Sequence, residues 1–405
     1  LFVSPVHANY QLKWPGFPLP DEGKSPAIDG GNPASPADPD GTRADMGPFP
    51  FEQTFTPLPG GDISGVLTCA GSPYYIDGDL LVPQGDELLI EPCVSLIFRG
   101  NYSMEVRGRL LAEGTSADRI NFAPSDTVTG WKGLRFYNTE NNSQDSSVLR
   151  HCRVTFGRGN PSVGNKGGAL LFTSSGDVLV ANCLLNKNKV SNEGGAVYIH
   201  GSNGPLLTGN TIENNQALSG GGVFGIYTQI NLSGNTIQNN TAQYGGAVHI
   251  HTSHFNSTGD VFRYNRADLY GGGLYFEAHG SCTFDPVNKS NIYLNYAGAA
   301  GLDLFYTGNM ANIKHVVVDT FTVQYLNKHF VYPMQSFTIS LSNHVVDQIT
   351  GDLYVSPTGS DSNTGTSPSS PLKTMHMACM KIWAEETSPR SIHLAPGTYS
   401  EGATG

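Results

Sequence analysis

The middle of the chain alternates apolar and polar positions with a period of two residues. Val197 and Ile199 are apolar, their neighbours Tyr198 and His200 are polar or aromatic, and residues 248–251 follow the same rule. Side chains of a β-strand point alternately to its two faces. The alternation therefore predicts short strands with one face in a core and the other face outside.

These strands belong to a repeat of 25 to 28 residues that contains two recurring words. The first word is Gly-Gly-Ala-like and occupies residues 167–170, 194–197, 220–223, 245–248 and 271–274, with a degenerate copy at 299–302. The second word places an apolar residue three positions before an asparagine, in Leu185…Asn188, Ile212…Asn215, Ile237…Asn240, Phe262…Asn265 and Ile292…Asn295. A repeat of this length that cannot bury its apolar face alone is typical of a solenoid.

Stacking such repeats, one coil on the next, predicts an all-β parallel β-helix. The paired glycines fit tight corners with positive φ, and the recurrent asparagines fit turns in which stacked amides bond to one another. Alternating segments also occur over residues 74–98 and 104–136, so we expect the β-helix to span residues 59–350. About ten coils, spaced by about 4.8 Å, would make a rod on the order of 50 Å long.

The two words resemble the repeats of the polymorphic outer-membrane proteins, and Phe262-Arg263-Tyr264-Asn265 matches the second word literally. The resemblance covers residues 165–305, and many bacterial surface proteins with pectin-lyase-like β-helices carry similar words. It implies a right-handed parallel β-helix that is secreted or displayed at the cell surface, often as an adhesin. The membrane β-barrel found at the C-terminus of such proteins has no counterpart in this sequence.

The two ends of the chain resemble parts of other β-helix domains. Residues 1–58 resemble the closing segment of such a domain, and residues 351–405 resemble the opening segment of a following one. Because the chain also lacks an initiator methionine and a signal-peptide pattern, we expect a mature product or an excerpt of a longer protein. Its partners would be neighbouring β-helix domains or, if the tail of one subunit completes the head of the next, copies of itself.

An amphipathic helix is predicted over residues 371–386. Ser370 is suited to cap it, Pro371 suits its first turn, and the apolar residues from Leu372 to Trp383 fall on one face. We expect this helix to plug the open N-terminal end of a β-helix stack and to protect its unpaired strand edge.

Charge, apolar runs and cysteine content limit the partners and the cellular compartment that we expect for the chain. The net charge of −11 argues against nucleic acid as a partner, and no run of 18 apolar residues predicts a membrane-spanning helix. The six cysteines show no zinc-binding spacing. Cys69 and Cys93 are one coil apart, so we expect a disulfide between them in an oxidising exterior, while Cys152 and Cys183 are either bonded or buried as thiols.

Catalysis is a weaker interpretation than scaffolding. Polysaccharide hydrolysis needs clustered carboxylates, and lyase chemistry needs acidic calcium ligands beside a basic residue. The repeats contain no Asp-Asp pair, and their acids are scattered: Asp177, Glu193, Glu213, Asp260, Asp268, Glu277, Asp285 and Asp303. We therefore expect a non-enzymatic adhesin, stalk or fibre, with a polysaccharide-binding or polysaccharide-degrading protein as the alternative.

An exposed strip on one outer face is the candidate surface for glycans or a partner protein. Coil stacking predicts two neighbouring columns, which include Tyr198, His200, Phe224, His249, His251, Tyr275 and Glu277. Aromatic side chains offer large amphipathic area at low entropic cost, which suits sugar rings. The alternative is that loops or a neighbouring domain cover the strip.

Calcium is the candidate cofactor. Asp38, Asp40 and Asp45 surround Gly41 with a spacing that partly matches calcium loops, in which alternating oxygen ligands wrap the cation. A hydrogen-bonded turn built by the same aspartates is the alternative.

Overall fold

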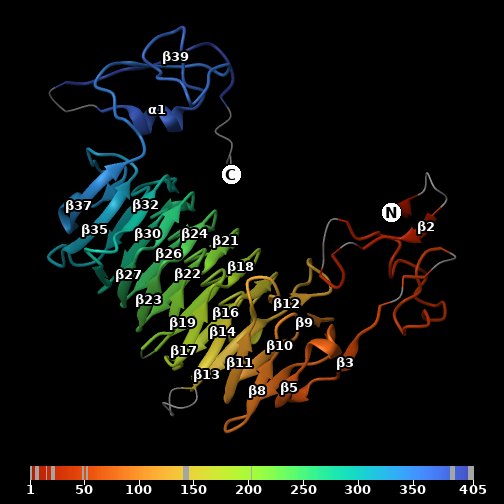
Figure 1. Cartoon of the computed structure of the whole chain (residues 1–405). Coiled ribbons are helices and arrows are strands. Elements are labelled where there is room, and N and C mark those ends of the chain that lie inside the picture. Colours follow the sequence, from red (N-terminus) through yellow and green to blue (C-terminus); the bar gives the residue numbers. More distant parts are fainter. Residues whose placement is uncertain are drawn as a thin grey trace.

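The chain forms a single long stack of β-coils with a smaller unit at either end (Figure 1). The computed structural model describes residues 2–4, 9–14, 16–19, 23–47, 50–51, 53–139, 146–201, 203–383 and 388–399. Three parallel sheets run the length of the stack, and consecutive strands of the chain pass from one sheet to the next.

Sheet 1 contains β4 (Gly61–Asp62), β7 (Leu80–Val82), β10 (Ser103–Val106), β13 (Gly133–Tyr137), β16 (Leu170–Thr173), β19 (Val197–His200), β22 (Val223–Ile226), β26 (Val248–His251), β30 (Leu274–Glu277), β34 (Leu304–Thr307) and β36 (Val331–Tyr332). The strands from β16 to β34 are the ones that the glycine words precede. Sheet 2 contains β5 (Gly65–Leu67), β8 (Glu87–Ile90), β11 (Arg109–Glu113), β14 (Ser147–Arg150), β17 (Val178–Ala181), β20 (Leu206–Thr208), β23 (Gln229–Ser233), β27 (His254–Thr258) and β31 (Ser281–Phe284). The chain crosses the two sheets in this order in the coils up to β31, whereas β34 and β36 lead directly to strands of the third sheet.

Sheet 3 closes each coil and contains β3 (Thr56–Leu58), β6 (Tyr74–Ile76), β9 (Ser95–Phe98), β12 (Ile120–Pro124), β15 (Cys152–Thr155), β18 (Leu184–Asn186), β21 (Thr211–Glu213), β24 (Thr236–Gln238), β28 (Val261–Arg263), β32 (Ser290–Tyr293), β35 (Lys314–Phe321) and β37 (Phe337–His344). A small corner sheet joins β25 (Thr241–Tyr244), β29 (Arg266–Tyr270) and β33 (Tyr296–Ala297). The inward side chains of the three long sheets form one continuous apolar core. This arrangement confirms the predicted all-β parallel β-helix.

Buried asparagine ladders hold the corners of the coils together. In the longer ladder, Nδ2 of each asparagine donates to Oδ1 of the next at 2.9–3.0 Å, through Asn188, Asn215, Asn240, Asn265 and Asn295. The ladder ends where Asn295 donates to Asp303 at 3.0 Å. A shorter ladder runs through Asn210 and Asn235 and ends at Asp260. Each asparagine thus satisfies backbone groups that would otherwise be buried without partners.

The N-terminal segment packs against the outside of the first coils. It contains the antiparallel pair β1 (Phe2–Ser4) and β2 (Asn9–Leu12) and a small core around Trp14. Leu19 and Phe55 cover an apolar part of the outer face of sheet 3 near Tyr75, whose ring stacks on Phe55 at 4.4 Å. The segment therefore occupies one end of that face.

The C-terminal unit contains the parallel strands β38 (Leu353–Val355) and β39 (Ile392–Leu394) and the helix α1 (Met375–Lys381). The predicted helix exists but is shorter than expected. Leu372 stays extended because its N–H bonds to the Tyr354 carbonyl, and Thr374, not Ser370, caps the helix by accepting a hydrogen bond from the Met377 N–H. Residues 384–386 of the predicted helix lie outside the described residues.

Helix α1 packs on two sides. Ala378 belongs to the core of the C-terminal unit, whereas Met380 belongs to the core of the main stack. Ile382 bridges to Ile349 and ends the helix, and the Trp383 ring stacks on Tyr325 at 4.0 Å. The helix therefore covers the C-terminal end of the long stack as well as the first strands of the next unit. No helix among the described residues has the length and apolarity needed to cross a membrane.

Candidate functional site

The predicted strip lies in two in-register columns on the outer face of sheet 1. Tyr198, Phe224, His249 and Tyr275 form the first column. The second column includes His200, His251 and Glu277. The expectation that the first column is exposed is wrong, because its four side chains are only 2–6% exposed. The second column is half-buried, so binding of a glycan or partner there stays a prediction.

The glycine corners explain why the first column is buried. Gly220 and Gly245 have φ values of 64°, and a Cβ atom at either glycine would lie 2.9 Å from the Cβ of Phe224 or His249. The chain therefore turns directly over the aromatic column, where only glycine fits. Tyr244 of the corner sheet adds a further layer, with its ring 5.9 Å from that of Tyr275. For the first column, the alternative that other parts of the chain cover the strip is the one found.

A histidine–glutamate pair connects the two columns. The imidazole Nε2 of His249 lies 2.8 Å from Oε2 of Glu277, and Nδ1 of His251 lies 3.9 Å from the same oxygen. Burial lowers the pKa of His249 although Glu277 opposes the shift, and the hydrogen bond from His249 lowers the pKa of Glu277. Because a carboxylate only accepts hydrogen bonds, the neutral His249 carries its proton on Nε2. The pair anchors the buried column to the half-exposed one.

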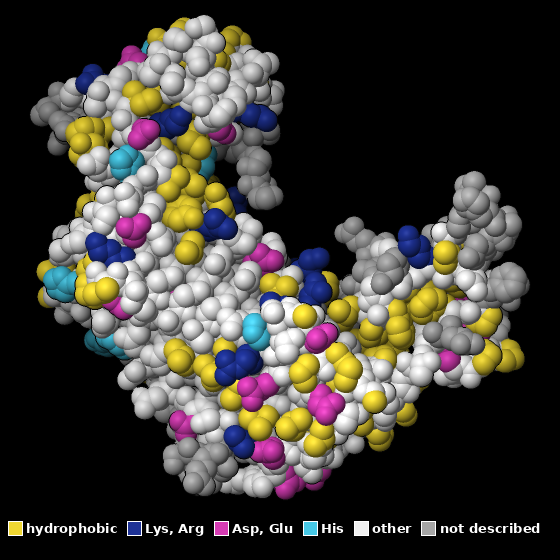
Figure 2. Space-filling model, viewed as in Figure 1, with side chains coloured by type: hydrophobic (Ala, Val, Ile, Leu, Met, Phe, Trp, Pro, Cys, Tyr) yellow, Lys and Arg dark blue, Asp and Glu magenta, His cyan; other side chains and the backbone are white. Residues whose placement is uncertain are grey.

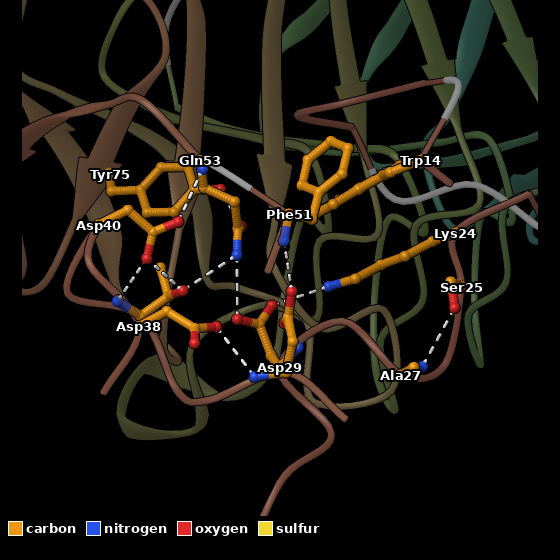
Figure 3. A network of polar contacts seen from close by, with 12 residues as sticks. Trp14, Lys24, Ser25, Ala27, Asp29, Asp38, Asp40, Phe51, Gln53 and Tyr75 are labelled. Carbon is orange, nitrogen blue, oxygen red and sulfur yellow. Dashed lines mark hydrogen bonds and ion pairs between the residues drawn. The ribbon is translucent and has the colours of Figure 1, made fainter. Parts of the chain in front are cut away.

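The three aspartates of the predicted calcium loop accept hydrogen bonds from nearby backbone groups, and Figure 3 shows Asp38 and Asp40 within this network. Oδ2 of Asp38 accepts from the Asp45 N–H at 2.9 Å, and the two oxygens of Asp40 accept from the N–H groups of Thr42 and Gln53 at 2.9 and 2.7 Å. Asp45 in turn accepts from the N–H groups of Asp29 and Phe51. The carboxylates therefore hold the fold of the N-terminal segment, as the alternative interpretation of this sequence expects.

The pKa values of two aspartates in this network shift in opposite directions. Burial raises the pKa of Asp45 against its backbone hydrogen bonds, while hydrogen bonds from Thr42 and Gln53 outweigh burial and lower the pKa of Asp40. No group of three or more His, Cys, Asp and Glu side chains in the described part of the chain is arranged to hold a metal ion. Calcium binding stays a prediction, which calcium-dependent melting of the unaltered chain and of Asp40→Ala would test.

The structure joins Cys69 and Cys93 in a disulfide, with their Cα atoms 5.6 Å apart. It connects neighbouring coils at the start of the stack. Cys152 and Cys183 are buried thiols, and the Cys152 N–H donates to Sγ of Cys183 at 3.3 Å. Cys183 thereby occupies the place that asparagine takes in the following coils, since its own N–H donates to Oδ1 of Asn210.

A polar row on the outer face of sheet 3 was not anticipated from the sequence. Oε2 of Glu213 accepts from Gln238 at 2.8 Å, and Oε1 of Gln238 accepts from Nε of Arg263 at 2.9 Å. The Arg263 guanidinium also lies 5.6 Å from the ring centroid of Tyr264, which is 50% exposed. The signal was present, because each of the first three residues directly follows the apolar residue of the second word. The row presents a fixed cation beside an exposed aromatic ring.

Comparison with known proteins supports the fold. The family described as "Right handed beta helix region" matches residues 131–318. Neither a curated protein nor a solved structure matches the chain. The chain folds as a right-handed parallel β-helix, and the central coils of this fold are the part that the family model matches. The match is to β-helices in general and does not extend to the narrower resemblance to polymorphic outer-membrane protein repeats.

Proposed function

We propose that the chain is a non-enzymatic, extracellular β-helix that serves as a structural and adhesive segment of a cell-surface adhesin, stalk or fibre. Its stacked coils form a rigid elongated body that suits reach and display (Figure 1). The disulfide between Cys69 and Cys93 favours an oxidising compartment.

The observation that carries this proposal is the location of two carboxyl groups with strongly raised pKa values, those of Asp260 and Asp303. Burial raises the pKa of Asp260 to about 6 and that of Asp303 to about 7. Carboxyl groups with such shifts mark catalytic sites when they line a cleft. Here both side chains are fully buried and accept hydrogen bonds from the last asparagines of the ladders. Their perturbed pKa values therefore fit a role in holding the stack together.

The C-terminal unit supports assembly with further β-helix units. Its second strand places Ile392 and Leu394 in register with the buried Leu353 and Val355 of the first strand. Leu394 is nevertheless 51% exposed. A further coil stacked on this strand would bury it, as coils do throughout the main stack. Neighbouring β-helix domains or copies of this chain would supply such a coil.

The polar row on sheet 3 favours a second candidate function, the binding of an acidic polysaccharide. Nε of Arg263 is held by Gln238 and its Nη1 lies 3.4 Å from the Tyr293 hydroxyl, so the guanidinium is oriented before any ligand arrives. A guanidinium pairs with carboxylates, and the exposed ring of Tyr264 suits a sugar face. Binding by this surface is compatible with adhesion and needs no catalytic step.

Two measurements test the proposal, one on intact cells and one on the purified full chain. Antibodies against the chain should label intact, unpermeabilised cells, because the chain would be displayed outside the membrane. A panel of acidic and neutral polysaccharides should keep its chain length during prolonged incubation with the protein. Depolymerisation that is lost in Arg263→Ala would contradict the non-enzymatic proposal, and labelling only after permeabilisation would contradict the extracellular one.

A further inference from the structure

The outer face of sheet 2 carries an aliphatic column over six consecutive strands. The strand register places these side chains one above another: Val66, Leu89, Leu111, Val148, Leu179 and Leu206. Val66 is 55% exposed, Leu206 is 44% exposed, and the four between them are half-buried. We call these six residues the aliphatic column.

The aliphatic column has a defined end. In the next three strands, the same position is occupied by Asn231, Asn256 and Thr283. Single exposed apolar residues are normal on protein surfaces, whereas a contiguous apolar patch marks an interaction site. Six residues spaced by about 4.8 Å form a line of about 24 Å on a flat sheet face. Such a line fits the face of another sheet.

Charges of both signs flank the aliphatic column. Arg109 pairs with Glu87 at 2.6 Å, and on the opposite side Arg150 pairs with Glu113 at 3.2 Å. Figure 2 shows hydrophobic side chains among acidic and basic ones over the first coils, near β5, β8 and β11 of Figure 1. A surface that carries charges of both signs does not favour a partner with a large net charge. It can, however, be complementary to the same surface on a second copy of the chain.

We propose that the aliphatic column is the interface for a second copy of this chain, packed face to face with its stack antiparallel to the first. A two-fold axis parallel to the strands, between β11 and β14, brings Val66 opposite the second copy's Leu206 and Leu111 opposite the second copy's Val148. The same operation sets Glu113 opposite the second copy's Arg150. All six aliphatic residues and the central ion pair are thus self-complementary, as a two-fold interface requires.

The rim of this interface tolerates its one unfavourable contact. The antiparallel arrangement sets Glu87 opposite the second copy's Asp177, which precedes β17. The ion pair of Glu87 with Arg109 neutralises this contact. The pairing is lateral, so it differs from end-to-end joining of units, and it goes beyond the proposed function because it specifies which face of the rod contacts another rod.

Sedimentation equilibrium of the full chain over a range of concentrations tests the interface. We expect a monomer–dimer equilibrium between 43.2 kDa and twice that mass. Leu111→Glu places like charges at the centre of the interface and should weaken dimerisation by about a hundred-fold or more. The matched control is Asn256→Glu, which adds the same charge in the same column beyond its apolar part and should leave the equilibrium unchanged. Circular dichroism melting of both variants verifies that they fold.

Charge reversal tests the orientation of the two copies. Glu113→Arg and Arg150→Glu should each weaken the dimer, and the double variant should restore it. Restoration by Glu113→Arg with Arg109→Glu would indicate parallel stacks and overturn the antiparallel arrangement. A chain that stays monomeric at every concentration, or a dimer as sensitive to Asn256→Glu as to Leu111→Glu, would overturn the interface itself. None of these results depends on glycan binding or on cellular location, so the proposed function is tested separately.

Discussion

Replacing Asn215 with leucine removes one amide from the middle of the longer asparagine ladder. Oδ1 of Asn215 accepts hydrogen bonds from the backbone N–H and from Nδ2 of Asn188, at 3.0 and 2.9 Å. Its Nδ2 donates to the Leu185 carbonyl at 3.0 Å and to Oδ1 of Asn240 at 2.9 Å. Asn215 is 1% exposed, so water has no access to replace these partners.

The substitution leaves the backbone N–H of Asn188 and one of its two Nδ2 hydrogens without an acceptor, while the other Nδ2 hydrogen keeps the Val154 carbonyl. Each orphaned donor costs about 1–3 kcal/mol, so we expect the free energy of unfolding around this coil to fall by about 2–6 kcal/mol. Coils of a solenoid contact only their neighbours, so the loss should be local. Hydrogen–deuterium exchange of β18, β21 and β24 measures it, because local opening free energies appear directly as lost protection.

The matched control is Asn291→Leu, which makes the same chemical change on the half-exposed outer face of β32. Water solvates that position, so the cost there should stay within about 0.5 kcal/mol. Equal protection of β18 and β21 in the two variants would refute the reasoning that the buried ladder stabilises the stack.

Three further predictions concern the glycine corners, the buried carboxyl group of Asp303 and the disulfide of the first coils. Gly220 and Gly259 have φ values of 64° and 66°, but a Cβ would lie 2.4 Å from a carbonyl oxygen only at Gly220 and would meet nothing within 4 Å at Gly259. Gly259→Ala should cost about 1–2 kcal/mol from backbone strain, and Gly220→Ala about 1–3 kcal/mol more from overpacking; equal thermal melts would contradict this. The pKa of Asp303 rises from 3.8 to about 7 on burial, so the folded chain retains a proton that the unfolded chain releases. Stability should therefore fall as pH rises from about 4 to about 7, and an unchanged melting profile in Asp303→Asn would count against this. Reducing the Cys69–Cys93 bond, which spans 24 residues, should destabilise the first coils by about 3–4 kcal/mol; peptide mapping without reductant checks the bond.

The sequence predicts the coils and their register because the same two words recur at a nearly constant period. In-register columns such as Tyr198 above Phe224 follow directly from that repetition. Burial of the first column does not follow from it, because the covering layer depends on how closely each glycine corner approaches the column and on Tyr244 from a separate small sheet. A period of two distinguishes the faces of a strand, but it does not tell whether the outer face is covered.

The start of the helix and the polar row on sheet 3 are two further features that the local sequence pattern does not predict. The pattern of apolar residues from Leu372 onward fits a helix, but Leu372 pairs with the distant Val355 and delays the start of the helix. The row that includes Gln238 and Arg263 holds a fixed position after the apolar residue of the second word, but the residue type at that position differs from coil to coil, so the repeat alone does not indicate a polar row. Contacts between segments far apart in the sequence decide both features.

Electron microscopy of the purified full chain at several concentrations tests the central claim, a rod-shaped β-helix that acts as a scaffold, most directly. We predict elongated particles at low concentration, with a strand stack on the order of 50 Å long. At higher concentration the rods should associate side by side in antiparallel pairs. Compact particles with no long axis at any concentration would contradict the account.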